Sequence, residues 1–160
     1  MGWKNSGKTT LVERLVAEIT ERGLSVSTVK HAHHAFDVDK RGTDSHRHRA
    51  AGAAQTIVSS ARRWALISEL RGRPETDLEE LLTLMAPVDL VLVEGYKSAS
   101  HPKIEVRGLS GETARPIAAF DPGVEAIATR MPFVHPGLPV FDQDDVPGIA
   151  GFILSRTGVR

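Results

Sequence analysis

The sequence predicts an α/β fold in one domain, built on a mainly parallel sheet. Short segments rich in β-branched residues alternate along the chain with segments whose apolar residues recur at helical spacing. Strands that alternate with helices are typical of parallel sheets. The chain has 160 residues, 41% of them hydrophobic, which suits a single globular domain over residues 1–160. In such folds ligands bind at the carboxyl ends of the strands.

The first predicted helix opens with a phosphate-binding motif. Residues 2–9 read GWKNSGKT, which matches the complete pattern G-x-x-x-x-G-K-[ST]. Apolar residues follow at helical spacing from Leu11 to Ile19, and Gly23 stands where a helix would end. A glycine-rich loop that leads directly into a helix predicts the P-loop fold of nucleoside triphosphate-binding proteins.

Each fixed position of the motif has a separate task on a nucleoside triphosphate. The glycines allow successive backbone N–H groups to point at phosphate oxygens. The Lys8 ammonium can reach the β- and γ-phosphates, and the Thr9 hydroxyl can hold Mg²⁺. The loop residues predicted to bind the phosphates are Gly2, Asn5, Ser6, Gly7, Lys8 and Thr9.

The strand that should precede this loop is missing from the sequence. A phosphate-binding loop connects a buried strand to a helix, and only Met1 precedes Gly2. We therefore expect the natural chain to carry about five to eight further apolar, β-branched residues upstream, which would make this sequence N-terminally truncated.

The middle of the chain predicts a strand, a polar loop, a short helix and a hairpin. Residues 24–30 alternate apolar and polar side chains and predict a strand, whereas residues 31–43 are polar and irregular. Residues 44–53 predict a short helix. Two β-rich segments, 55–60 and 64–69, are joined by a short link, which predicts an antiparallel hairpin added to the sheet.

The second half of the chain predicts two more helices and further strands. Thr76 and Glu79 form a capping-box pair at the start of one helix. The nearly continuous apolar run at residues 88–93 predicts a strand that is covered on both faces. Asp144 or Asp145 is expected to cap the last helix. Shorter strands are predicted at residues 103–107, 116–120, 126–129 and 139–141.

Two acidic residues delimit the apolar strand, and only one of them can serve a metal. Asp89 and Glu94 are about 16 Å apart in an extended strand and face opposite sides of the sheet. Because nucleotides bind at the carboxyl ends of strands, Glu94 is predicted to be the Mg²⁺-side acid and Asp89 a turn residue. Asp39, in the polar loop, is a second candidate, since an Asp there can take a Mg²⁺-bound water as switch loops do.

A group of histidines leaves a metal site open as an alternative. Imidazole suits Zn²⁺ and Ni²⁺. Two members of the group, His46 and His48, face different sides of a helix, and the chain has no cysteine to complete a tetrahedral site. We therefore favour contact of this segment with a nucleotide or cofactor. The histidines of the group are His31, His33, His34, His46 and His48.

The composition argues against several function classes. Lysine plus arginine and aspartate plus glutamate number 20 each, so the formal net charge is zero and nothing predicts a nucleic-acid or anionic-membrane partner. No apolar run approaches the roughly 20 residues that a membrane span needs. The simplest interpretation is a cytoplasmic protein.

Several of these segments together resemble the molybdopterin-guanine dinucleotide biosynthesis protein B family (MobB). The resemblance covers most of residues 2–107 and returns more weakly at residues 126–154. Its most specific part is the combination of three segments: Lys30-His31, Asp37-Val38-Asp39 and Glu94-Gly95-Tyr96-Lys97. The other segments that carry it are 28–34, 42–45, 51–56, 63–66 and 89–97.

The resemblance implies a GTP-binding homodimer that assists molybdopterin-guanylyl transferase, the enzyme that joins GMP to molybdopterin, and that hydrolyses GTP slowly at best. It adds Thr10 to the phosphate and Mg²⁺ contacts of Thr9, and it places Glu94 at the second metal-side position. Lys8 and the metal would polarise the γ-phosphate, so Lys8 and Glu94 are the candidate catalytic residues. Lys30, His31 and Asp39 would lie near the triphosphate or the molybdopterin of the partner.

Two departures from related patterns leave the base undetermined. The chain has no Asn-Lys-x-Asp motif that would read guanine, and Arg130 follows Ala128-Thr129 where some relatives carry an acid.

Two other functions remain open. The histidines favour a metallochaperone GTPase that delivers nickel or zinc, and a P-loop small-molecule kinase would use the Arg71–Arg73 segment as a lid.

Overall fold

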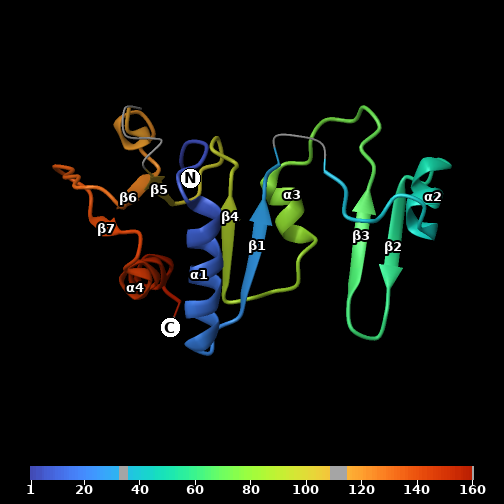
Figure 1. Cartoon of the computed structure of the whole chain (residues 1–160), viewed down its shortest axis with the longest axis horizontal. Coiled ribbons are helices and arrows are strands. Elements are labelled where there is room, and N and C mark those ends of the chain that lie inside the picture. The colour runs from blue at the N-terminus through green and yellow to red at the C-terminus, as the bar shows by residue number, and fades with distance from the viewer. Residues whose placement is uncertain (33–35, 109–114, 160) are drawn as a thin grey trace. The chain divides into compact units, whose positions relative to one another are not determined.

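The computed structural model describes residues 1–32, 36–108 and 115–159, which form two compact units (Figure 1). Unit 1 consists of Met1–His31 and Ala86–Arg160, and unit 2 of Ala32–Met85. The phosphate-binding loop and the apolar strand predicted to carry the metal-side acid both belong to unit 1.

The strands of unit 1 are all parallel, as the sequence predicts. Strand β1 (Val26–Lys30) pairs with β4 (Leu90–Glu94), in a register that sets Lys30 beside Glu94. A second sheet has the order β5-β6-β7, with bounds Lys103–Arg107, Val124–Thr129 and Val140–Asp142. Parallel pairing brings the carboxyl ends of neighbouring strands to the same edge, which is where the site is built.

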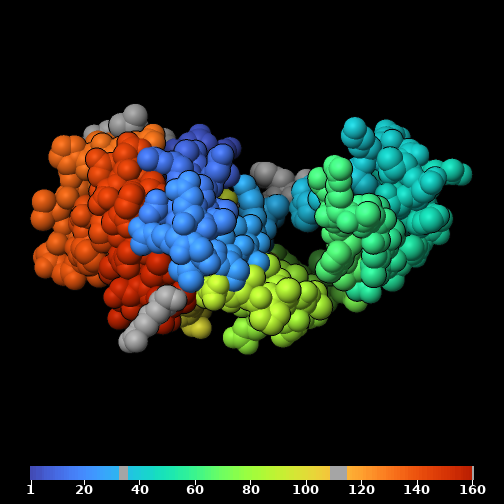
Figure 2. Space-filling model, turned by 90° about the horizontal axis from the view of Figure 1, so that it is seen from below, coloured from blue at the N-terminus to red at the C-terminus, as the bar shows by residue number. Residues whose placement is uncertain are grey.

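Two helices of unit 1 cover these strands. Helices α1 (Lys8–Glu21) and α4 (Val146–Thr157) pack against each other and lie side by side in Figure 2. As predicted for α4, the Asp145 side chain accepts a hydrogen bond from the Gly148 N–H at 3.0 Å. The core beneath the helices consists of Leu11, Leu15, Ile19, Leu90, Val106, Ala128, Val146, Ile149 and Ala150.

Strand β4 is less covered than its apolar sequence predicts. Leu90 is buried, but the three apolar residues that follow it are only half-buried. Within the described part of the chain β4 pairs with β1 alone, which leaves its other edge without a strand. Met1 instead pairs with β5: its ammonium donates to the Ile104 carbonyl at 2.6 Å, and the Val106 N–H donates to the Met1 carbonyl at 2.7 Å.

Unit 2 contains the predicted hairpin and two short helices. The prediction that the hairpin is added to the parallel sheet is wrong, because among the described residues its two strands pair only with each other. Strands β2 (Gln55–Ser59) and β3 (Trp64–Ser68) pair antiparallel in a two-stranded sheet, and α2 (Asp44–Ala50) packs on β2. Helix α3 (Leu78–Thr83) has Asp77 as its N-cap, with the Asp77 carboxylate accepting from the Glu80 N–H at 2.8 Å. The predicted Thr76–Glu79 cap is therefore wrong by one residue.

The segment 116–120 is not the predicted strand. It forms the 3-10 turn η2 (Ile117–Ala119), because Pro116 has no N–H to donate and the Ala118 N–H donates to the Glu105 carboxylate at 2.9 Å. Across the described residues, no helix has both the length and the apolar character that a membrane crossing requires.

Candidate functional site

The phosphate-binding loop has the backbone geometry that its glycines predict. Gly7 adopts φ +89°, a left-handed conformation that strains other residues, and α1 begins at the next residue. A Cβ added to Gly2 would lie 2.3 Å from the Val106 carbonyl oxygen, so only glycine fits there against β5. The loop therefore runs from Met1, which pairs with β5, into the amino terminus of α1, where N–H groups are unpaired within the helix.

Lys8 lies across the loop in a positively charged environment. Its ammonium donates to the Trp3 carbonyl at 2.6 Å and to the Ser6 hydroxyl at 3.4 Å. Partial burial lowers the pKa of Lys8; the Glu94 charge opposes that shift, and the Lys97 and Lys30 charges add to it. Lys8 is thus influenced by two other ammonium groups and one carboxylate. This excess of positive charge favours a polyanion such as a triphosphate.

Thr9 and Glu94 meet at the carboxyl end of β4. The Thr9 hydroxyl donates to Glu94 Oε1 at 2.9 Å, and the Lys30 ammonium is 3.5 Å from Glu94 Oε2. A hydroxyl and a carboxylate side by side provide the hard oxygen ligands that Mg²⁺ takes, together with phosphates, in nucleotide sites. The structure thus brings together two of the residues predicted to hold the metal, Thr9 and Glu94.

Asp89 lies at the opposite end of β4, as the strand geometry predicts. Its carboxylate accepts from the Ser25 N–H at 2.7 Å and from the Ser25 hydroxyl at 2.6 Å. These hydrogen bonds lower the pKa of Asp89. Asp89 therefore joins the amino ends of β1 and β4 and has no place at the loop.

The other loop and strand-end candidates lie around this centre. Ser6 is a buried residue of the loop, Asn5 has a positive φ of 61°, and Thr10 is exposed on the first turn of α1. The His31 N–H donates to the Glu94 carbonyl at 2.8 Å, and its ring centroid lies 5.0 Å from that of Tyr96. The predicted His31 is therefore at the same strand edge as Glu94.

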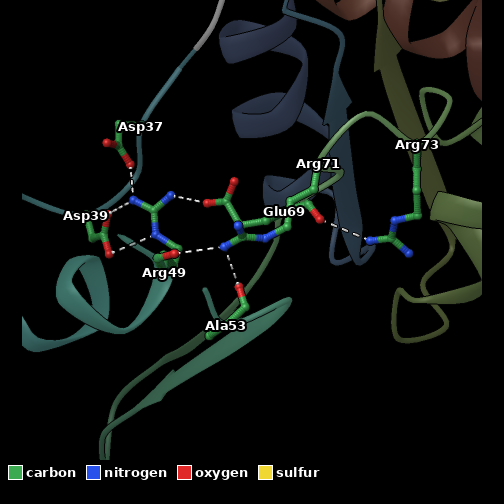
Figure 3. Close-up of polar contacts among 7 residues, drawn as sticks. All are labelled: Asp37, Asp39, Arg49, Ala53, Glu69, Arg71 and Arg73. Carbon is green, nitrogen blue, oxygen red and sulfur yellow. Dashed lines mark hydrogen bonds and ion pairs between the residues drawn. The ribbon is translucent and has the colours of Figure 1, made fainter. Parts of the chain in front are cut away.

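Asp39 belongs to a separate polar cluster in unit 2, centred on Arg49 of α2 (Figure 3). The guanidinium donates to both carboxylate oxygens of Asp39, to Asp37 at 2.6 Å and to Glu69 at 2.5 Å. These bonds lower the pKa of Asp39. Its predicted role as a Mg²⁺ ligand stays a prediction, and a metal would have to displace Arg49 from both oxygens.

Arg71 and Arg73, in the turn after the hairpin, bind to backbone carbonyls of the same cluster. The Arg71 guanidinium donates to the Arg49 carbonyl at 2.8 Å and to the Ala53 carbonyl at 3.2 Å, and Arg73 donates to the Glu69 carbonyl at 3.1 Å. These bonds hold Arg71 and Arg73 in a turn of unit 2, where they tie the backbone together. Nothing in that arrangement favours the kinase lid.

The histidines do not form a metal site among the described residues. His46 and His48 lie on α2, and His33 and His34 fall outside the residues that the structure describes. Within the described ranges no group of three or more histidine, aspartate or glutamate side chains is arranged to hold a metal ion.

Comparison with known proteins decides the family. A family model described as molybdopterin guanine dinucleotide synthesis protein B, MobB, matches residues 1–130. The chain belongs to this family. The resemblance inferred from the strand-end and loop residues is therefore confirmed.

Relatives and solved structures agree with the MobB assignment. Proteins named molybdopterin-guanine dinucleotide biosynthesis adapter protein are 41% identical in Escherichia coli, over 95% of this chain and 87% of the relative, and 38% identical in Haemophilus influenzae, over 95% and 84%. The crystal structure of Bacillus subtilis MobB superposes with a TM-score of 0.75 at 32% identity, over 97% of this chain and 93% of that one. A MobB homologue from Bacillus stearothermophilus gives a TM-score of 0.73 at 31% identity, over 99% and 95%.

The fold is accordingly that of the MobB proteins, a P-loop type of α/β architecture with mainly parallel strands, as predicted. The sequence analysis overlooked one residue at the loop. Gln143 is buried and donates to the Ser6 carbonyl at 3.3 Å. Nothing in the local sequence marks it, because it is one polar residue in a polar run between β7 and α4.

Proposed function

We propose that this protein binds GTP with Mg²⁺ as an accessory protein of molybdenum-cofactor biosynthesis, acting in the synthesis of molybdopterin-guanine dinucleotide. The observation that carries the proposal is the convergence of Lys8, Thr9 and Glu94 at one strand edge, with Thr9 and Glu94 2.9 Å apart. The adapter role is supported by the names of the Escherichia coli and Haemophilus influenzae relatives.

The chain's own residues have distinct tasks in this proposal. The loop from Gly2 to Thr10 would hold the phosphates through its N–H groups and through the Lys8 ammonium. Thr9 and Glu94 would hold Mg²⁺, which when bound neutralises charge on the phosphate oxygens. Lys30 and His31, at the same edge, would contact the triphosphate or the molybdopterin.

Hydrolysis would be slow at best. Lys8 stabilises negative charge on the γ-phosphate, and Glu94 contributes by fixing the metal beside Thr9. Efficient hydrolases also orient the attacking water with a dedicated side chain. The sequence offers no clear glutamine beside the β4 strand end for that task.

We also propose a cytoplasmic homodimer that works with molybdopterin-guanylyl transferase. The support for self-association is an apolar face of the unit 2 hairpin. Ile57 and Leu66 pair across the strands, next to Trp64, and their exposed fractions are 66%, 37% and 67%. The opposite hairpin face carries Thr56, which is buried. A second copy of the chain would cover the apolar face.

Calorimetric titration of the whole chain with GTP and with ATP, each with Mg²⁺ and with EDTA, tests the nucleotide and the metal. We expect GTP to bind at least about tenfold more tightly than ATP, and Mg²⁺ to strengthen the binding. Equal affinity for the two nucleotides would remove guanine from the proposal. No binding of either would remove the nucleotide function. Adding the guanylyl transferase to the GTP-loaded chain tests the adapter role through the formation of a complex.

A further inference from the structure

Gln143 connects the phosphate-binding loop to two strand ends. Its side chain is 3% exposed, and it lies in the short segment between β7 and α4. The amide Nε2 donates to the carbonyls of Arg107 at 2.7 Å, Ser6 at 3.3 Å and Ala128 at 3.4 Å. These carbonyls belong to the end of β5, the loop and β6, so one side chain joins three segments that are remote in sequence.

The Gln143 side chain also leaves little space for a side chain at position 7 of the loop. A Cβ added to Gly7 would lie 2.8 Å from Gln143 Oε1. Gln143 therefore contacts both Ser6 and Gly7, the two residues directly before α1. Its two amide hydrogens are shared among three buried carbonyls, and a buried polar group of this kind stabilises one backbone arrangement because other arrangements leave it unpaired.

The peptide bond between Ser6 and Gly7 explains what this contact does. A trans peptide is planar, so its carbonyl and its N–H point in opposite directions. Gln143 holds the Ser6 carbonyl toward the interior, and the Gly7 N–H must then point away from Gln143. Outward N–H groups at the start of a helix are the groups that bind phosphate.

We propose that Gln143 is a positioning residue of the phosphate-binding loop, which fixes the Ser6–Gly7 peptide in the orientation that presents its N–H to a nucleotide phosphate. The proposal rests on the GTP-binding function proposed above. The Gln143 side chain is buried and its amide is hydrogen-bonded to the carbonyls of Ser6, Arg107 and Ala128, so it acts through the loop.

The test compares Gln143→Met with Ile149→Val. Met has a similar length to Gln but no N–H donor. Ile149 is a buried core residue of α4, and its replacement by Val only removes packing. Gln143→Asn, which keeps the amide on a stem one methylene shorter, serves if the Met variant does not fold. Thermal unfolding of each variant measures its general loss of stability, and two other readouts measure the loop.

The first readout is the backbone ¹⁵N order parameter of residues 2–9 in the protein without nucleotide. We expect it to fall from about 0.85 to below about 0.6 at Gly7 and Lys8 in Gln143→Met and to stay unchanged in Ile149→Val. The second readout is GTP affinity, which should weaken at least about tenfold in Gln143→Met and less than about twofold in Ile149→Val.

A rigid loop in Gln143→Met, or GTP affinity equal to that of Ile149→Val, would overturn the positioning role. Failure of the wild-type chain to bind GTP is a different outcome. It would remove the proposed function, and the order parameters alone would then decide whether Gln143 fixes the loop.

Discussion

The Thr9 hydroxyl donates a hydrogen bond to Glu94 Oε1 at 2.9 Å, although 85 positions separate the two residues in the chain. Thr9 begins a helix and Glu94 ends a strand, so the contact depends on how α1 packs over β4. The contact places the Thr9 hydroxyl beside the Glu94 carboxylate. The prediction for Glu94 and Mg²⁺ below depends on this arrangement.

Replacing Glu94 by Gln should weaken the Mg²⁺ dependence of GTP binding more than the binding in EDTA. The amide keeps the size of the side chain but loses the charge that favours a divalent cation. GTP titrations at a series of Mg²⁺ concentrations measure the effect. Asp89→Asn is the matched control, because Asp89 lies at the other end of the same strand and should leave the Mg²⁺ dependence unchanged. A larger effect from Asp89→Asn would contradict the site.

Replacing Lys8 by Ala should remove triphosphate binding and preserve the fold. A lost charge-assisted contact to phosphate costs about 2–3 kcal/mol, which weakens binding roughly thirtyfold or more. Isothermal titration with GTP measures the loss, and circular dichroism checks the fold. Lys4→Ala, in the same loop at a position the motif leaves variable, is the control. Unchanged GTP affinity in the Lys8 variant would show that the loop does not bind phosphates.

Replacing Trp64 by Ser should shift the protein toward the monomer. Trp64 is 67% exposed on the apolar hairpin face, and burying such a residue against a second copy contributes strongly to association. Sedimentation velocity over a range of concentrations gives the dimer dissociation constant. Leu84→Ser removes a residue of unit 2 that is 61% exposed but lies at the end of α3, so it should leave association unchanged. Equal behaviour of the two variants would exclude the hairpin face.

Replacing Asp121 by Asn should reduce the acid sensitivity of unit 1. Lys103 is buried and donates to Asp121 at 2.9 Å, and this bond lowers the pKa of Asp121 below its usual value. The lowered pKa stabilises the fold above the unfolded-state pKa of about 3.9, and that contribution is lost as the pH falls toward the folded-state value. At pH 7 the variant should be about 3 kcal/mol less stable, since Lys103 loses its partner.

Urea unfolding between pH 7 and pH 2 checks this prediction. The stability difference between wild type and Asp121→Asn should narrow as the pH drops below about 4, because the wild-type carboxyl also becomes neutral there. A difference that stays constant across the range would show that the Asp121 charge does not contribute.

A β-branched segment fused ahead of Met1 should stabilise unit 1. The hydrogen bonds of Met1 to Ile104 and Val106 have the parallel pattern, so added residues would continue alongside β5. We expect about five to eight apolar residues to raise the melting temperature by roughly 4 °C or more. A Gly/Ser segment of equal length is the control. Equal melting temperatures would show that the edge of β5 gains nothing from further strand pairing.

The local parts of this protein could be predicted from sequence because their causes are local. Four features depend on residues that lie close together in the sequence. They are the loop of residues 2–9, the bounds of α1, the hairpin and the Asp145 cap. Glu94 was also predictable, since the direction of a parallel strand decides which of its ends faces the ligand. The segment 116–120 was mispredicted because a long-range bond from Ala118 to Glu105 decides its conformation.

The sequence by itself determined the phosphate-binding loop, the strand-end acid and the MobB resemblance. Only the tertiary structure decided which distant groups hold these parts in place. Gln143 contacts Ser6 across 137 positions, and Arg49 contacts Glu69 across 20. Such contacts leave no periodic or motif signal, because a single polar side chain finds its partners only after the strands and helices have packed. The position of the loop lysine can therefore be read from a motif, whereas the buried glutamine that contacts the loop is found only from the fold.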